Sequence, residues 1–123
     1  MTNQAAGLAV TLTTDRSAYA VGAPISMTLR VENESAELIA FEFTSAQRYD
    51  FLVMDSEGDE LWRWSEGRMF TMALGTETVE PGETLAYTET LGEGLPEPGR
   101  YRIEGVLTAR DRRASASLVI RVE

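Results

Sequence analysis

The sequence predicts an all-β protein of about eight antiparallel strands, arranged as a sandwich or a barrel. Apolar residues recur with a period of two along most of the chain. Turn residues interrupt this alternation about every ten residues. No segment shows a convincing 3.6-residue helical period. Since no linker rich in proline or glycine divides the chain, we expect one domain over residues 8–123, preceded by a flexible tail over residues 1–7.

The strands are expected where the alternation is clearest: residues 8–13, 25–32, 39–43, 49–54, 61–64, 85–89, 101–108 and 114–122. Ile25, Met27, Leu29 and Val31, for example, alternate with polar residues, which predicts a strand with one buried face. Turns separate the strands, and Gly58 can adopt the positive φ that a tight hairpin requires.

Residue types that are missing from the sequence exclude most catalytic chemistry. The 123-residue chain has no cysteine and no histidine, and all eleven basic residues are arginine. It therefore cannot form a Ser-His-Asp triad, a lysine Schiff base or a typical zinc site. A pair of carboxylates could still hydrolyse a glycoside, but twenty acidic residues bring some pair together by chance. We expect no enzyme, no catalytic residue, no cofactor and no metal.

The negative net charge of the chain indicates which classes of partner it can bind. A formal net charge of −9 disfavours binding to nucleic acid and to anionic membranes. The absence of cysteine favours a reducing compartment, and residues 1–7 lack the basic and apolar parts of a signal peptide. We therefore expect a monomeric protein in the cytoplasm.

Residues 65–78 interrupt the alternation. This connection is long for a compact domain, and such connections are usually functional or disordered. It contains Met69, Phe70, Met72 and Leu74, and these apolar residues argue against disorder. Two interpretations stay open: a loop that contacts a partner, or an edge strand that covers the core.

Several motifs together resemble the bacterial intracellular proteinase inhibitor family over about residues 8–122. The matching residues are Phe41-x-Phe43-x-Ser45-x-Gln47-x-Tyr49-Asp50-Phe51, Gly58, Trp62-Arg63-Trp64-Ser65, Arg68-Met69-Phe70, Pro81-Gly82-Glu83 and Pro98-Gly99-x-Tyr101. The resemblance implies an immunoglobulin-like sandwich that inhibits an intracellular subtilisin-like serine protease. It supplies no established reactive residue.

An inhibitor of such a protease would present an extended loop to the cleft, where one side chain fills the specificity pocket. Subtilisin-like pockets generally accept large apolar side chains. We therefore expect partner contacts from Arg68, Met69, Phe70, Thr71, Met72 and Leu74, with support from Trp62, Trp64 and Ser65. The glycine-containing loop at residues 91–96 is a weaker candidate, since flexibility costs entropy on binding.

The sequence is also compatible with functions other than protease inhibition. A non-inhibitory protein-binding or carbohydrate-binding module is the main alternative, with Tyr49, Trp62 and Trp64 as the aromatic platform. A structural module could also pair its edge strands with a partner. The acidic run at residues 55–60 suggests calcium but departs from the EF-hand pattern, so a hairpin turn is the preferred interpretation.

Overall fold

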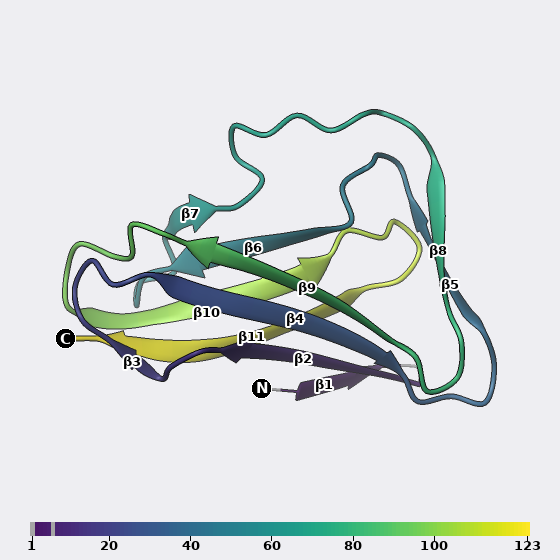
Figure 1. The fold of residues 1–123 in the computed structure, drawn as a ribbon, viewed down its shortest axis with the longest axis horizontal. Helices are drawn as coiled ribbons and strands as arrows, with labels where there is room; N and C mark the ends of the chain where they lie inside the picture. The colour runs from purple at the N-terminus through teal and green to yellow at the C-terminus, as the bar shows by residue number, and fades with distance from the viewer. Residues whose placement is uncertain (1, 6) are drawn as a thin grey trace.

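A computed structural model describes residues 2–5 and 7–123, which form two packed β-sheets and a small third sheet across one end (Figure 1). The described residues contain eleven strands and no helix. None of them belongs to a helix long and apolar enough to cross a bilayer. The predicted all-β sandwich is therefore confirmed.

Sheet 1 has the strand order β1-β2-β4-β9, and each neighbouring pair is antiparallel. Its strands are β1 (Thr2–Ala5), β2 (Leu8–Thr14), β4 (Ile25–Asn33) and β9 (Thr84–Leu91). In the register, Leu29 of β4 lies opposite Leu12 of β2 and Tyr87 of β9. Residues that lie opposite one another share a face, so this row points into the sandwich.

Sheet 2 has the order β3-β11-β10-β6-β7. Its strands are β3 (Ala18–Tyr19), β11 (Ala114–Val122), β10 (Gly99–Leu107), β6 (Tyr49–Met54) and β7 (Glu60–Arg63). Only the short pairing of β3 with β11 is parallel among the described strands. Sheet 2 carries the two strands, β6 and β7, from which the candidate site begins.

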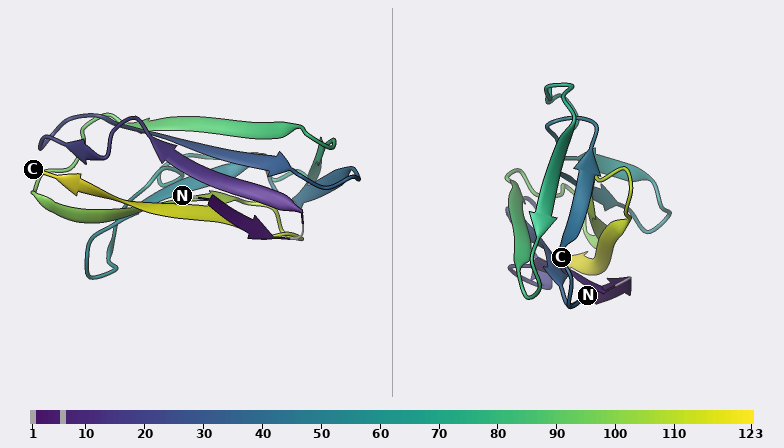
Figure 2. Two further views of the ribbon diagram at one scale, coloured as in Figure 1. Left: turned by 90° about the horizontal axis from the view of Figure 1, so that it is seen from below. Right: turned by 90° about the vertical axis from the view of Figure 1, so that its right-hand side faces the viewer.

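The third sheet joins β5 (Ile39–Phe43) to β8 (Gly75–Val79) in an antiparallel pair. It runs across the end of the sandwich, nearly at right angles to the long strands (Figures 1 and 2). Asn33, at the end of β4, is fully buried at the corner that leads to β5. Its amide donates to the carbonyls of Glu37 and Val79, both at 2.8 Å. These bonds fix the position of the third sheet.

The core lies between the sheets and follows the predicted alternation. All four apolar residues of β4 that were expected to face inward are completely buried. The phenylalanines of the expected aromatic stretch are also buried: Phe41, Phe43 and Phe51. Gly58 has a φ of 88°, as the hairpin prediction required.

Three parts of the chain differ from the expectation. Thr2–Ala5 pairs with β2 as a strand, whereas residues 1–7 were expected to form a flexible tail; Met1 and Ala6 lie outside the described residues. The two-residue strand β3 was not expected. Residues 75–79 form β8, so the irregular segment ends earlier than its predicted limit at residue 78.

Candidate functional site

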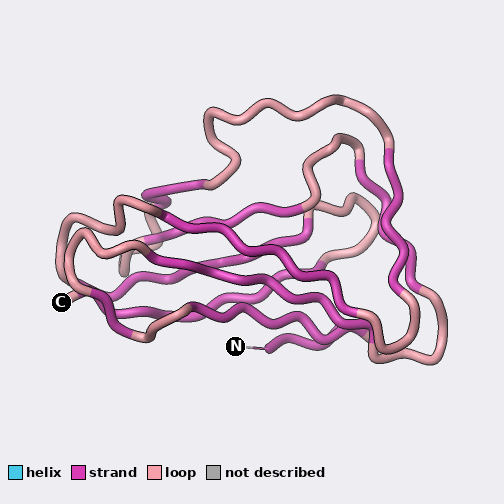
Figure 3. The backbone as a smooth tube through the Cα atoms, viewed as in Figure 1, coloured by secondary structure: helices cyan, strands magenta, loops and turns pink. Residues whose placement is uncertain are grey.

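The long connection between β7 and β8, here called the β7–β8 loop (residues 64–74), is the candidate site. It leaves the body of the sandwich and passes over one side of it before it reaches the end sheet (Figure 3). After a tight turn at residues 64–67, residues 68–74 form neither a strand nor a helix. The edge-strand interpretation is therefore wrong for residues 69–74, which form a loop. That this loop contacts a partner stays a prediction.

A buried carboxylate holds the start of the β7–β8 loop. Asp50 of β6 is 3% exposed. Its carboxylate accepts hydrogen bonds from the Ser65 backbone N–H at 3.0 Å and from the Ser65 hydroxyl. It also accepts from the Phe51 N–H at 2.9 Å and pairs with the Arg63 guanidinium at 3.3 Å. Four donors on one carboxylate satisfy its buried charge and fix the loop to sheet 2.

Aromatic stacking holds the turn that follows. The ring of Trp64 stacks on Tyr49 with centroids 4.7 Å apart, and Tyr49 stacks in turn on Tyr87 of β9 at 4.5 Å. Phe70 packs against the same indole at 5.8 Å. The four rings form a continuous row that links the loop to both main sheets.

Arg68 also folds back onto the turn. Its guanidinium carbon lies 4.4 Å from the centre of the Trp64 ring, and its Nε donates to the Trp64 carbonyl at 2.9 Å. A cation over an indole face is attracted by the ring quadrupole. Arg68 and Phe70, both expected to contact a partner, therefore first serve as internal ties of the loop.

The far part of the β7–β8 loop is held separately. The Ala46 backbone N–H donates to the Thr71 carbonyl at 2.8 Å, and the Ala73 N–H donates to the same oxygen at 3.0 Å. Gly75 then enters the ladder with β5. Beyond it, Arg48 bonds the Glu77 carboxylate at 3.0 Å. The loop is thus fixed at its start, at its centre and at its end without a disulfide.

Three apolar side chains of the loop point into solvent. The exposed fractions are 98% for Met69, 81% for Met72 and 79% for Leu74. Burying a side chain of this size is worth about 1.5–3 kcal/mol. This row of exposed apolar groups on a tied backbone can bind an apolar surface with little loss of backbone freedom.

Tyr49 connects the site to the opposite sheet through a hydrogen bond as well. Its hydroxyl donates to the inward-facing carboxylate of Glu89 on β9. Burial, together with the hydrogen bond and charge of Glu89, raises the pKa of Tyr49 to about 12. The hydroxyl therefore stays protonated, and remains a donor, throughout the physiological pH range.

The proposed carbohydrate platform is not assembled as an open surface. Tyr49, Trp62 and Trp64 are half-buried and packed against the core. Trp64 and Phe70 lie next to one another, and Tyr49 has an aromatic ring on each side. A sugar ring needs a free aromatic face, so this arrangement disfavours that alternative.

The acidic hairpin between β6 and β7 behaves as a turn. Carboxylate oxygens of Asp55, Glu57 and Asp59 lie within 4.8 Å of one another. One oxygen of Asp55 accepts the backbone N–H groups of Glu57 and Asp59, each at 2.9 Å. This side chain therefore closes the hairpin, in agreement with the preferred interpretation of the sequence.

The second candidate loop is packed rather than open. Leu91 and Leu95 are buried, and the Gly22 N–H donates to the Leu95 carbonyl at 3.0 Å. Gly94 has a φ of 63°, and a Cβ there would lie 2.3 Å from the Ala23 carbonyl oxygen. This close approach explains the glycine as a packing requirement.

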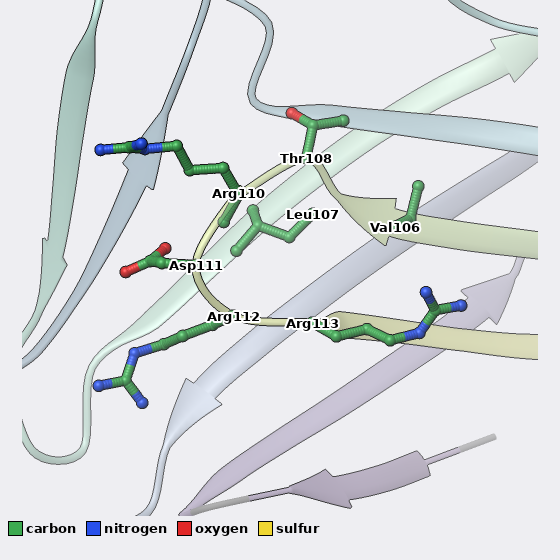
Figure 4. Close-up of a pocket in the computed structure, with 8 residues that line it drawn as sticks. Val106, Leu107, Thr108, Arg110, Asp111, Arg112 and Arg113 are labelled. Atoms are coloured by element: carbon green, nitrogen blue, oxygen red, sulfur yellow. The ribbon is translucent and has the colours of Figure 1, made fainter.

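A different hollow, of about 410 Å³, lies at the loop between β10 and β11 and is lined by residues 106–113 (Figure 4). Its arginines spread apart instead of converging on one point. Among the described residues, it offers no set of catalytic groups.

Sequence reasoning found the exposed loop but missed the residues that hold it. Asp50 occupies an outward position in the alternation of β6, which ordinarily indicates a solvated carboxylate. The roles of Glu89 and Ala46 could not be recognised in the sequence either, because their hydrogen-bond partners are distant along the chain. The unusual Tyr49-Asp50-Phe51 triplet, with a charge between two aromatic residues, was the one available sign.

Solved structures of similar fold include Spo0M, the sporulation control protein of Bacillus subtilis, with 18% identity and a TM-score of 0.60 over 97% of this chain and 50% of that chain. The alkylpurine DNA glycosylase AlkC of Pseudomonas fluorescens has 12% identity and a TM-score of 0.56 over 96% and 31%. The CARDB domain of a Pyrococcus furiosus protein has 15% identity and a TM-score of 0.56 over 94% and 87%. At these identities the likeness shows the fold alone. This chain spans half the length of the Spo0M chain and less than a third of the length of the AlkC chain.

No curated protein sequence matches the chain. A family model described as intracellular proteinase inhibitor matches residues 12–112, which is most of the chain. The match includes strands β3 to β10, with the whole end sheet and the whole β7–β8 loop, and it leaves out β1, most of β2 and β11. The chain therefore belongs to the intracellular proteinase inhibitor (BsuPI) family, a family of inhibitors and not of enzymes.

Proposed function

We propose that this protein inhibits an intracellular subtilisin-like serine protease by placing the β7–β8 loop in the cleft of the enzyme. The observation that carries the proposal is the row of exposed apolar side chains on a tied loop: Met69, Met72 and Leu74. Large apolar groups gain most from entering an apolar pocket. Membership of an inhibitor family supplies the general function, and the exposed side chains support the β7–β8 loop as the contact.

The ties explain how the loop could inhibit without being a good substrate. A flexible loop would lose conformational entropy on binding and would also relax after cleavage. Here Asp50 holds one end, and the Ala46 N–H holds the Thr71 carbonyl in the centre. Phe70 lies on Trp64, so its ring acts as an anchor while its neighbours stay available.

The same proposal includes a setting and a stoichiometry. The protein acts as a monomer in the cytoplasm, where one inhibitor binds one protease. The absence of cysteine fits a reducing compartment, and the loop depends on hydrogen bonds and stacking in place of disulfides.

The first experiment titrates the purified protein against a purified subtilisin-type protease and, in parallel, a metalloprotease. We expect inhibition of the serine protease alone at about one-to-one stoichiometry. A Met72→Asp variant should weaken inhibition at least about tenfold, since a carboxylate cannot enter an apolar pocket unpaired. Val119→Asp is the matched control, because Val119 is also exposed (61%) but lies on β11, away from the loop.

Two results would count against the proposal. Equal inhibition by wild type and by the Met72→Asp, Met69→Asp and Leu74→Asp variants would remove the loop from the interface. Inhibition of the metalloprotease alone would show that the target is not a serine protease.

A further inference from the structure

The loop between β10 and β11, here called the arginine loop (residues 108–113), reverses the sign of the surface locally. Arg110, Arg112 and Arg113 lie within four consecutive residues, and all three are exposed. The whole chain has only eleven basic residues and a net charge of −9. An acidic partner would therefore be repelled by most of this surface and attracted here.

Part of the arginine loop is fixed to the end sheet. The Arg110 backbone N–H donates to the Glu42 carbonyl at 2.8 Å, and the Glu42 N–H donates to the Asp111 carboxylate at 3.0 Å. The Arg110 and Glu42 side chains also form an ion pair at 3.5 Å. Both side chains are about half exposed, so the pair adds little stability. The backbone bonds give the loop a defined position beside β5.

The other two arginines are available. In the described part of the chain, neither Arg112 nor Arg113 forms an ion pair or a side-chain hydrogen bond. Figure 4 shows both side chains directed away from the loop, in opposite directions. Their guanidinium groups can therefore meet carboxylates from outside, in the two-bond geometry that arginine favours.

The arginine loop adjoins the end of the β7–β8 loop. A hollow of about 240 Å³ is lined by Leu74 and Arg110 together, along with Glu42, Phe43, Gly75 and Thr76. A partner seated on Leu74 would therefore reach the arginine loop without spanning any other part of the surface. The arginine loop and the far part of the β7–β8 loop both lie toward the end of the molecule that carries β5 and β8 (Figure 1).

We propose that the arginine loop is a second contact of the inhibitor, which binds an acidic surface patch next to the cleft of the protease. This inference rests on the proposed function and adds the charge of the partner to it. Exposed charges at the rim of an interface act mainly on the rate of association. The arginine loop therefore steers the acidic patch of the protease into place beside the β7–β8 loop, while the apolar contacts hold the enzyme there.

The test compares two double variants of equal charge. Arg112→Glu/Arg113→Glu reverses the arginine loop, whereas Arg100→Glu/Arg102→Glu makes the same change at the other end of β10. Arg100 and Arg102 are exposed, and the Arg102 guanidinium donates to the Ser117 hydroxyl at 3.0 Å. Association and dissociation rates are measured with the same purified subtilisin-type protease, at low and at physiological ionic strength.

We expect the arginine-loop variant to associate at least about tenfold more slowly at low salt, with a dissociation rate close to that of wild type. The difference should shrink at physiological ionic strength, because salt screens exposed charges. The control pair should change the association rate by much less. Thermal unfolding of both variants, measured by circular dichroism, should match that of wild type.

Other outcomes separate the two proposals. If both double variants slow association equally, only the overall charge matters, and the arginine loop is not a contact. If association is unchanged in the arginine-loop variant while Met72→Asp abolishes inhibition, the second contact is refuted and the proposed function stands. If wild type binds no protease, both proposals fall.

Discussion

Met27 and Met69 carry the same side chain in opposite environments. Met27, in the centre of β4, is completely buried, whereas Met69, in the β7–β8 loop, is 98% exposed. Met27 lies opposite Thr14 and Glu89 in a ladder that sets which face it occupies. Met69 has no strand partner, and the bonds around it hold its neighbours instead. Folding therefore needs the first methionine and leaves the second free to bind.

Under the proposed function, this difference separates the residues that stabilise the fold from those that recognise the protease. The two main sheets supply the buried apolar area, and the β7–β8 loop uses polar ties and ring stacking to hold its shape. Its exposed apolar side chains can thus be changed for function at little cost to the fold. Variants of the core, of the tie and of the stack should show effects of decreasing size.

The largest effect is expected in the core. Met27→Ala should lower the free energy of unfolding by about 2–5 kcal/mol, because it leaves a cavity between the sheets. Met69→Ala should change it by no more than about 0.5 kcal/mol. Urea unfolding of both variants checks the comparison. A similar loss in the two would contradict the separation of roles.

The tie at Asp50 should give an intermediate effect on stability and a separate effect on binding. Asp50→Ala leaves the Phe51 N–H and the Ser65 N–H without an acceptor, which should cost about 2–3 kcal/mol of unfolding free energy. Protease inhibition should also weaken, although no exposed side chain has changed. Ser65→Ala removes only one of the four donors and serves as the milder variant.

Inhibition by Asp50→Ala is measured at a temperature where the variant is fully folded. A loss of inhibition then reports on the shape of the loop and not on unfolding. Full inhibition by folded Asp50→Ala would show that the tie is not needed to shape the loop. Tighter inhibition than wild type would show that the loop rearranges on binding.

The smallest effect is expected at the ring stack. Tyr49→Phe removes the hydrogen bond to Glu89 and should lower the free energy of unfolding by about 1 kcal/mol. Because the pKa of Tyr49 is raised from 10.0 to about 12 in the folded protein, the folded state holds this proton more tightly. Its contribution is fully present below pH 10 and is lost as the pH rises toward 12.

The contribution of the Tyr49 hydroxyl to the pH dependence of stability is obtained by comparing wild type with Tyr49→Phe. Tyr19 and Tyr87 also have raised pKa values, mainly through burial, so both proteins should lose stability above pH 10. Wild type should lose more than Tyr49→Phe. Urea unfolding of both proteins at pH 8 and at pH 11 provides four free energies of unfolding. An equal loss of stability in the two proteins would show that the Tyr49 hydroxyl does not contribute to this pH dependence.

Regular alternation made most of the sandwich predictable. The period-two pattern of β4, β10 and β11 gave both their existence and their buried faces. β1 lacked that pattern, since Thr2–Ala5 contains no large apolar residue, and β3 is too short to show a period. Strands of this kind are recognised only once their partner is in place.

The candidate site was predictable in position and not in mechanism. An irregular apolar segment after Trp64 indicated the loop, and its exposed methionines agree with that expectation. Arg68 and Phe70 looked like contact residues, but both lie against Trp64. Side-chain ties between distant segments leave no periodic trace in a sequence, so the role of Asp50 required the fold.

The central claim, that the β7–β8 loop enters the protease cleft, can be tested directly by amide hydrogen exchange. The inhibitor is studied alone and with a subtilisin-type protease whose catalytic serine has been replaced by alanine. We predict strong additional protection of the amides of residues 68–74 and weaker additional protection of those of residues 108–113. The amides of β2 and β4 in sheet 1 should show no change. Unchanged exchange in residues 68–74, together with new protection elsewhere, would contradict the account.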